Sequence, residues 1–179
     1  GMGVVYLRRH DGSPLRADLT QKAALVRDYY DPHHRRLEEC VFQHLRAFGR
    51  AIIIDCHSFP SVPLPYELVQ DQQRPEICIG ADPVHTPNWL SAALVSAFER
   101  QGYSVSVDTP FAGAIVPARF FRSSDQVLSA MIEIRRDLYM DENSGERRAT
   151  LADVAADTAI AIAAVREAGG KGEASLSSP

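Results

Sequence analysis

The run AIIIDCHSFPS at residues 51–61 constrains the fold more than any other stretch of this chain. Four apolar residues lead directly into Asp55, Cys56, His57 and Ser58, and a proline-containing loop follows. A continuous apolar run is typical of a β-strand that is covered on both faces, as in a largely parallel sheet between helices. We therefore expect residues 51–56 to form an interior strand that delivers polar side chains to one edge of the sheet.

Helical and strand-like patterns alternate along the rest of the chain. Apolar residues at helical spacing predict helices, with Pro32 interrupting the first pair and Gly49 ending the second helix. These helices are expected over residues 18–30, 33–48, 88–101 and 149–165. Further strands are expected over residues 76–80, over residues 103–108 near an edge, and within residues 129–140. This alternation predicts an α/β layered sheet.

Composition bounds the domain organisation and the partners. The chain has 179 residues, a formal net charge of −4 and a hydrophobic content of 45%, which fits one soluble domain and favours neither nucleic acid nor an anionic membrane as a partner. No apolar run approaches the roughly 20 residues that span a bilayer, and no secretory signal is recognisable. We expect a cytoplasmic protein with one domain over residues 1–168 and a flexible tail over the Gly- and Ser-rich residues 169–179.

The three cysteines, Cys40, Cys56 and Cys78, lack the spacing of zinc-finger motifs. Because they fall in helical or strand-like patterns, we expect free, buried thiols in a reducing compartment. Adjacent side chains of a strand point to opposite faces, so Cys56 is expected to face the core, away from His57. The same alternation makes a cysteine hydrolase that uses a Cys56–His57 dyad a remote alternative.

Polar side chains follow each predicted strand. In α/β sheets, ligands gather at the carboxyl ends of the strands, so these side chains are expected to converge on one site. The candidates at the strand ends are Asp55 to Ser58, Asp82 with His85, Asp108 with Thr109, and Glu133. A loop around Gly113 is expected to bring its backbone close to another part of the chain.

His57 is the first candidate ligand of a metal ion. A histidine beside a buried strand can present one ring nitrogen to a metal while a carboxylate orients the other nitrogen. Asp55, two residues earlier, lies on the same face if the strand continues. The alternative is a hydrogen-bonded histidine at a strand end.

Glu133 is the candidate general base. It is flanked by Met131, Ile132 and Ile134, and a carboxylate in an apolar strand costs several kcal/mol unless it is paired, bound to a metal or protonated. Burial raises the pKa of such a group, which suits a base. The alternative is an ion pair with Arg119, Arg135 or Arg136.

Weaker candidates could bind the substrate. Arg27 could form a bidentate pair with a ligand carboxylate, although a solvated helix start is the alternative. At most one of His33 and His34 should face a site, because adjacent side chains on a helix diverge. Ser58 lines the predicted site without the sequence of a nucleophile elbow. His85 is either a ligand-binding residue or a loop histidine near a helix start.

Five runs together resemble the N-formylglutamate amidohydrolase family, and the most specific are the D-x-H-S after a strand and the ending M-I-E-I-x-R-x-L-Y-M-D-E. The runs are RDYYDPHH, IIIDCHSFPS, ICIGAD, DTPFAGAIVP and MIEIRRDLYMDE. That family is similar to the zinc carboxypeptidases. The resemblance implies a three-layer α/β/α sandwich with a mixed, largely parallel central sheet, as in phosphorylase/hydrolase-like folds.

The resemblance also implies an activity and roles for single residues. The implied reaction, part of histidine degradation, converts N-formyl-L-glutamate and water to L-glutamate and formate. By resemblance, His57 is a ligand of the Zn²⁺ cofactor, and Glu133 activates the metal-bound water. Arg27, His34 and Arg136 match positions that hold the carboxylates of an N-acyl amino acid or shape the pocket.

The chain departs from the family pattern because the resemblance begins partway along it. The family's earlier segment is expected to carry two further zinc ligands. His10, His34 or His85 could replace them only within about 2.1 Å of the metal. Arg135 stands where the family favours a smaller polar residue. Two hypotheses remain: a metal-dependent amidohydrolase, or a truncated, non-catalytic relative. Such a relative would bind a small carboxylate or self-associate, with a second copy covering an apolar edge.

Overall fold

A computed structural model describes residues 4–9 and 11–176 of the chain. A mixed, mostly parallel sheet of four strands lies at its centre, in the order β1-β4-β2-β3. The strands are β1 (Ala51–Phe59), β2 (Ile77–Gly80), β3 (Val105–Val107) and β4 (Val127–Arg135). β1 pairs with β4 and β2 pairs with β3 in parallel, whereas β2 pairs with β4 antiparallel.

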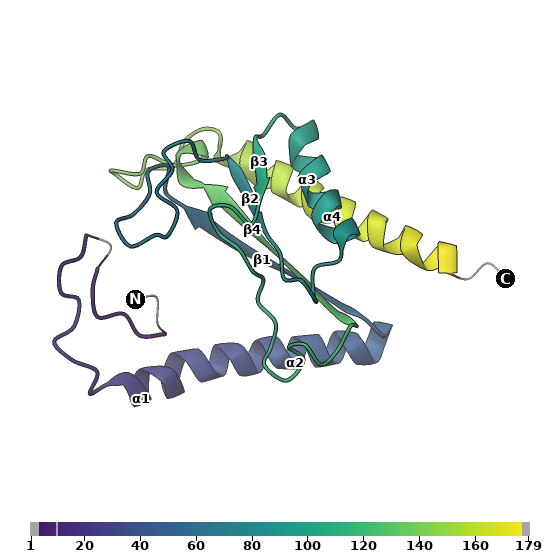
Figure 1. The fold of residues 1–179 in the computed structure, drawn as a ribbon, viewed down its shortest axis with the longest axis horizontal. Helices are drawn as coiled ribbons and strands as arrows, with labels where there is room; N and C mark the ends of the chain where they lie inside the picture. The colour runs from purple at the N-terminus through teal and green to yellow at the C-terminus, as the bar shows by residue number, and fades with distance from the viewer. Residues whose placement is uncertain (1–3, 10, 177–179) are drawn as a thin grey trace.

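Helices cover both faces of the sheet, which confirms the predicted three-layer α/β/α arrangement. α3 (Asn88–Arg100) and α4 (Leu151–Leu176) pack on one face, where Ile77, Ile79 and Ile132 are fully buried. α2 (Asp31–Phe48) packs on the other face through Val41, against Ala51 and Val127 at the beginnings of β1 and β4. In Figure 1, α2 lies at the bottom, on the β1 side of the sheet, and α3 and α4 lie at the upper side.

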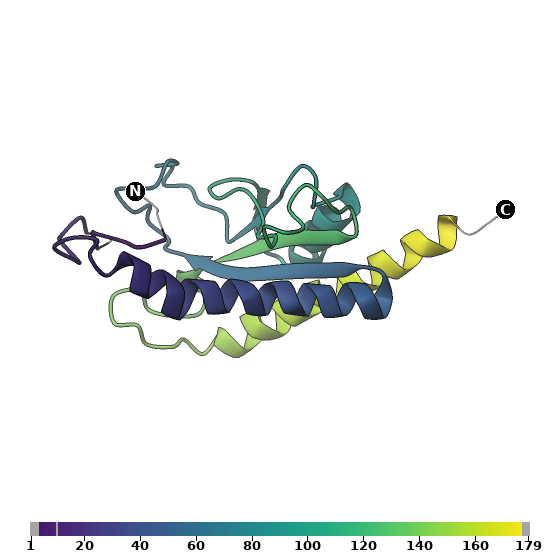
Figure 2. The same cartoon turned by 90° about the horizontal axis from the view of Figure 1, so that it is seen from below.

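The first helical stretch is continuous from residue 22 to residue 48, so the expectation that Pro32 interrupts it is wrong. α1 (Lys22–Leu25) passes through the π-helix η1 (Val26–Tyr30) into α2, as Figure 2 shows from below. Pro32 stands in the first turn of α2, where its missing N–H is tolerated, and the π-helical turn shifts the hydrogen-bond register just before it. Gly49 ends the helix at φ 69°, as predicted.

Two other boundaries differ from the sequence-based expectation. α4 continues to Leu176, so residues 169–176, expected as a tail, belong to the helix; residues 177–179 lie outside the described range. β1 continues to Phe59, and among the described residues it is an edge strand and not an interior one. Its apolar run predicted a strand with neighbours on both sides.

The cysteines differ in burial, and the prediction is correct only for some of them. Cys78 is buried and Cys40 is half-buried, but Cys56 is exposed. Cys56 does face away from His57, but that face of the edge strand is open at this point. None of the helices in the described part of the chain has the length and hydropathy needed to cross a membrane.

Candidate functional site

The polar groups after the strands do not converge on one edge of the sheet. β2 runs antiparallel to β4. The carboxyl ends of β2 and β3 therefore lie at one end of the strands, and those of β1 and β4 lie at the other end. Asp82 and Asp108 therefore lie far along the sheet from His57 and Glu133. Asp108 accepts a hydrogen bond from the Ala81 backbone, so these groups organise their own loops. The expected convergence is wrong, because it assumed that all four strands run parallel.

One row of side chains crosses three strands instead. His57 on β1 lies opposite Glu133 on β4, and Glu133 lies opposite Cys78 on β2. Residues directly opposite in a sheet project from the same face, so these three side chains share the face that α2 covers farther along. We call His57, Glu133, Cys78 and Asp55 the polar row.

Asp55 and His57 lie on the same face, because β1 continues through both residues. Asp55 Oδ2 lies 2.9 Å from His57 Nε2, and the His57 side chain is 50% exposed. A carboxylate at this distance fixes the ring orientation of the imidazole. The pair has the arrangement expected for an oriented histidine, and the other ring nitrogen has no partner among the described residues.

Glu133 is buried, with 8% of its surface exposed, and its Oε2 has no hydrogen-bond partner among the described residues. Burial raises the pKa of this carboxyl, while the nearby His57 and Arg136 act in the opposite direction. Among the described residues, the expected alternative of an ion pair does not occur. Arg135 pairs with Asp137, Arg119 pairs with Glu38, and Arg136 donates to Ser58. Glu133 thus carries a buried oxygen without a hydrogen-bond partner among the described residues.

A loop closes the row from the β2 side. The Cys78 thiol donates to the Phe111 carbonyl at 3.2 Å. A Cβ built on Gly80 would lie 2.4 Å from the Gly113 carbonyl oxygen, so only glycine fits where the loop crosses β2. The prediction that the loop around Gly113 passes close to another part of the chain is confirmed.

Arg74 is a buried residue near the polar row that the sequence did not single out. Its guanidinium pairs with Glu67 at 2.5 Å, with side-chain exposures of 1% and 5%. It also lies over the rings of Phe59 and Phe111, at 4.9 and 5.4 Å from their centroids. We call these four residues the Arg74 clamp. No pattern predicted it, since Arg74 lies in a polar, proline-flanked loop.

Ser58 and Arg136 contact each other. Arg136 Nε donates to the Ser58 hydroxyl at 3.1 Å, and Nη2 donates to the Ser58 carbonyl at 2.9 Å. Ser58 lies opposite Ile134, so alternation turns its side chain to the face opposite His57. Ser58 therefore does not line the polar row, whereas Arg136 lies near enough to influence Glu133.

His85 has no ring nitrogen free for a ligand. It is fully buried, its Nδ1 lies 2.7 Å from the Val127 carbonyl oxygen, and its Nε2 accepts a hydrogen bond from the Arg122 N–H at 2.8 Å. Because a carbonyl accepts and an N–H donates, the ring is a neutral tautomer with the proton on Nδ1. The predicted substrate-binding role is corrected to a structural one, which is the stated alternative.

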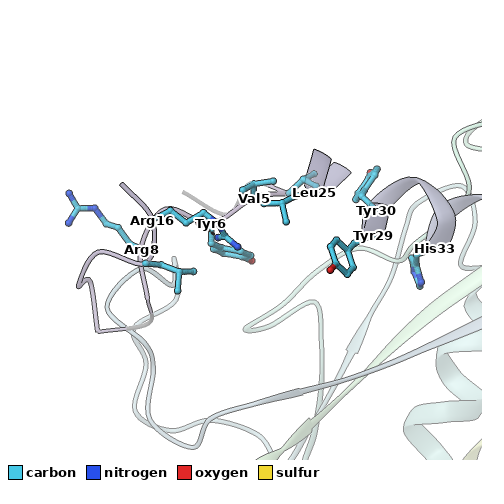
Figure 3. Close-up of a pocket in the computed structure, with 10 residues that line it drawn as sticks. Val5, Tyr6, Arg8, Arg16, Leu25, Tyr29, Tyr30 and His33 are labelled. Carbon is cyan, nitrogen blue, oxygen red and sulfur yellow. Dashed lines mark hydrogen bonds between the residues drawn. The ribbon is translucent and has the colours of Figure 1, made fainter. Parts of the chain in front are cut away.

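Arg27 and His34 lie on the first helical stretch. Arg27 pairs with its neighbour Asp28 at 2.6 Å and its side chain is 71% exposed. The ring of His34 lies tilted against that of Tyr30, with 4.0 Å between the ring centroids. Among the described residues, no hydrogen bond or ion pair joins them to the polar row. A hollow of about 740 Å³ lies nearby, lined by residues of the amino-terminal segment and by Tyr29, Tyr30 and His33. His33, the neighbour of His34, lines it, whereas Arg27 and His34 do not (Figure 3).

The described residues do not form a complete metal site. They contain no group of three or more His, Cys, Asp or Glu side chains that could hold a metal ion, and a catalytic zinc normally has three protein ligands. Of the replacement ligands, His85 has both ring nitrogens bonded to backbone groups. His34 lies on the first helical stretch and forms no group of three metal-binding side chains. His10 lies outside the described residues. Among the described residues, the polar row therefore offers a ring nitrogen of His57 that Asp55 does not bind and the buried, unpartnered Oε2 of Glu133.

Comparisons with known proteins find a family and a fold. A family model described as N-formylglutamate amidohydrolase matches residues 1–140. An N-formylglutamate amidohydrolase structure from Ralstonia eutropha JMP134 matches with a TM-score of 0.74 and 25% identity, covering 88% of this chain and 57% of that chain. The structure of a gene product from Agrobacterium tumefaciens matches with a TM-score of 0.61 and 22% identity, covering 97% of this chain and 63% of that chain. The chain thus spans less than two thirds of either structure, and no curated protein matches it.

Proposed function

Because this chain belongs to the N-formylglutamate amidohydrolase family, we propose that its polar row serves the hydrolysis of a formyl amide. The proposed reaction converts N-formyl-L-glutamate and water to L-glutamate and formate. The observation that carries the proposal is Glu133, a buried carboxyl whose free Oε2 lies on the same face of the sheet as the oriented His57. A soluble, cytoplasmic enzyme of histidine degradation is the setting that this reaction implies.

Glu133 acts as the general base in this proposal. Burial raises the pKa of Glu133 toward neutral pH. A base whose pKa lies nearer the working pH accepts a proton from water more readily. The oxygen of that water forms a bond to the formyl carbon, and the proton on Glu133 then passes to the leaving amide nitrogen as the C–N bond breaks. Arg136, which already influences Glu133, is proposed to hold a carboxylate of the substrate, with Arg27 and His34 as further candidates.

Zinc does not fit the described residues alone. His57, oriented by Asp55, is proposed as one ligand, but the polar row brings together no set of three donors. No step of the proposed reaction is therefore routed through a metal ion. A complete zinc site would need donors beyond the described residues.

Formate release from N-formyl-L-glutamate by the purified chain, with and without added Zn²⁺, tests the proposal. We expect turnover that the substitution Glu133→Gln reduces at least a hundredfold, because general-base catalysis contributes about 10²–10⁴-fold. Glu99→Gln, at an exposed position of α3, is the matched control and should leave the rate unchanged. Absence of formate release from the folded chain under both conditions would refute the proposed activity.

The lack of a third metal donor favours a second candidate, a relative that binds a small carboxylate without turning it over. Calorimetry with L-glutamate and with N-formyl-L-glutamate separates the two. Heat of binding from both compounds, with no formate released and with sensitivity to Arg136→Gln, would favour the binding function. Binding that is unaffected by Arg136→Gln would contradict this second candidate.

A further inference from the structure

Residues 110–114 form a short connection across the sheet, and both of its ends are fixed by serine side chains. The Ser106 hydroxyl on β3 donates to the Thr109 carbonyl, directly before this connection. The Ser129 hydroxyl on β4 donates to the Ile115 carbonyl, directly after it, at 2.7 Å. We call residues 110–114 the strap. It therefore leads from β3 to β4 and crosses β2, which lies between them.

The strap lies on the face of the sheet that carries the polar row. Ser106 lies opposite Cys78, and Ser129 lies four residues before Glu133 on β4. Opposite residues of neighbouring strands, and residues an even number apart on one strand, project from the same face. Both serines therefore project from the face of Cys78 and Glu133, and the strap passes over the β2 side of the polar row.

The middle of the strap is held only loosely. Within the described part of the chain, its one hydrogen bond is that from the Cys78 thiol to the Phe111 carbonyl, and a thiol is a weak donor. Gly113 has a φ of 92°, and no atom lies within 4 Å of a Cβ built on it. Segments with few hydrogen bonds and few contacts open at low cost in free energy. The strap can therefore lift between its two fixed ends.

One side chain of the strap is held by the Arg74 clamp. The Phe111 ring meets the Phe59 ring edge-on, with 5.5 Å between the centroids, and Arg74 lies over it at 5.4 Å. Arg74 itself is fixed independently of the strap, because it pairs with Glu67 and donates to the Pro60 carbonyl. Aromatic pairs and cation–π contacts each contribute a modest attraction. The clamp thus holds the strap against the sheet through a single ring.

Two polar groups are buried beside the strap. The Cys78 side chain has no exposed surface, and Glu133 Oε2 is buried without a hydrogen-bond partner among the described residues. The strands on either side are held by their paired neighbours, whereas the strap has one thiol hydrogen bond and one ring contact. A ligand atom can therefore reach Glu133 Oε2 from the β2 side only when the strap moves.

We propose that the strap is a lid on the β2 side of the polar row and that Arg74, stacked on Phe111, is its latch. When the lid opens, the Phe111 ring leaves Arg74 and Phe59, and the hydrogen bond from Cys78 to the Phe111 carbonyl breaks. Arg74 stays in place, because its ion pair with Glu67 does not involve the strap. Opening exposes the Cys78 thiol and, next to it, the buried side of the polar row.

The rate at which a thiol reagent labels Cys78 measures the opening of the lid. In a Cys40→Ser/Cys56→Ser background, Cys78 is the one remaining thiol. Phe111→Leu should raise its labelling rate about tenfold, because an aromatic pair and a cation–π contact are lost. Phe48→Leu, at a 75% exposed position of α2, is the matched control and should leave the rate unchanged. Far-UV circular dichroism checks that each variant is folded.

Arg74→Lys tests the latch. Lysine keeps a positive charge beside Glu67 but lacks the planar guanidinium that stacks on a ring. The labelling rate of Cys78 should rise about two- to fivefold, from the loss of the cation–π contact. An unchanged rate in Arg74→Lys would show that Arg74 is not the latch.

Urea separates opening of the lid from unfolding of the whole chain. Local opening exposes little surface, so the labelling rate of Cys78 should hardly depend on low urea concentrations, whereas global unfolding depends on urea steeply. Ala97→Cys, in a chain with all three native cysteines replaced by serine, reports global unfolding from a buried position of α3. Equal rates and equal urea dependence at Cys78 and at this position would overturn the lid.

The lid rests on the proposed function only where it names Glu133 as the group that opening makes accessible. The labelling experiments do not use turnover, so their outcome and the release of formate are independent results. A folded chain that releases no formate refutes the proposed activity alone. A labelling rate of Cys78 that Phe111→Leu does not raise refutes the lid alone.

Discussion

Glu133 and His85 are both buried ionisable residues, but they differ in whether their polar atoms have hydrogen-bond partners. Glu133 has an oxygen without a hydrogen-bond partner among the described residues. His85 has both ring nitrogens bonded to backbone groups. A buried polar group without a partner costs stability and is retained where it does chemistry, whereas a satisfied one holds segments together. At the scale of single residues, satisfaction of hydrogen bonds separates the candidate base from the structural histidine.

We predict that His85→Ala lowers the free energy of unfolding by about 3 kcal/mol. The substitution leaves the Val127 carbonyl and the Arg122 N–H without their partner, and each orphaned buried group costs about 1–3 kcal/mol. Urea denaturation followed by circular dichroism measures the change. His44→Ala, at an exposed position of α2, is the control. Equal stability of the two variants would show that His85 does not hold these segments.

Gly80 constrains the loop over the polar row because no side chain fits there. Gly80→Ala would bring a Cβ to 2.4 Å from the Gly113 oxygen and 2.5 Å from Met131 Cε. We predict a loss of about 1–3 kcal/mol, the usual cost of overpacking a core. Gly170→Ala, with nothing within 4 Å of its Cβ, should be neutral or stabilising, because alanine favours helix. Thermal unfolding compares the two, and a neutral Gly80→Ala would contradict this close approach.

The Arg74 clamp joins elements that the chain separates widely. Phe59 ends β1, Phe111 belongs to the loop after β3, and the Arg74 carbonyl accepts a hydrogen bond from Arg135 at the end of β4. Arg74 Nη1 also donates to the Pro60 carbonyl at 2.9 Å. At the scale of elements, the clamp ties the ends of β1 and β4 to the loop after β3, beside the polar row.

The clamp predicts a strongly non-additive pair of substitutions. Glu67→Leu alone should cost about 3–5 kcal/mol of unfolding free energy, because it leaves the Arg74 charge buried without its partner. Adding Arg74→Met should recover much of that loss, since no uncompensated charge remains. Glu39→Leu, which breaks the exposed pair with Arg36, should change little. Additive effects in denaturant titrations would mean that Glu67 and Arg74 do not act as a pair.

Tyr103 links the β3 side of the sheet to α4 through its hydrogen bond to Asp157. We predict that this link makes the folded state less stable at alkaline pH. Burial and the 2.8 Å hydrogen bond to Asp157 raise the pKa of Tyr103 above its ordinary value of 10.0. A raised pKa means that the folded state holds this proton more tightly. The stabilisation is therefore complete below pH 10 and is lost as the pH rises from that value toward the folded-state pKa.

Tyr103→Phe tests this dependence. The variant should lose about 1 kcal/mol near neutral pH, the usual net value of one hydrogen bond, and it should lack this alkaline component. Tyr66→Phe, at a 46% exposed position, should behave like the parent protein. Urea denaturation at a series of alkaline pH values measures the difference. Parallel stability curves for the parent and Tyr103→Phe would show that Tyr103 does not titrate in this range.

At the scale of the whole molecule, we predict that the purified chain binds zinc only weakly. The described residues gather no three metal-binding side chains, whereas a tight zinc site needs three or four ligands. After incubation with zinc and dialysis, elemental analysis should find less than one zinc ion per chain. His57→Ala should not lower that content measurably. One tightly held zinc ion per chain that depends on His57 would contradict this prediction.

Much of the layered architecture follows from the local pattern of the sequence. Apolar spacing over α3 predicts that Leu90, Leu94, Val95 and Phe98 point inward. Leu90, Leu94 and Phe98 are fully buried, and Val95 is half-buried. Gly49 marked the end of α2, because a left-handed residue there favours glycine. The motifs around His57 and Glu133 indicated the family that the family model also matches. Period and special residues are local properties, so a single sequence expresses them.

Strand direction and strand neighbours were decided only by the tertiary structure. The apolar run of β1 was identified from the sequence, but its place at an edge depends on which strands are present to pair with it. The antiparallel direction of β2 separated Asp82 and Asp108 from the polar row, and no local pattern encodes that direction. The sequence by itself determined that a strand presents Asp55 and His57 together, because side chains alternate. Only the pairing of β1 with β4 set Glu133 beside them, since register depends on contacts between distant segments.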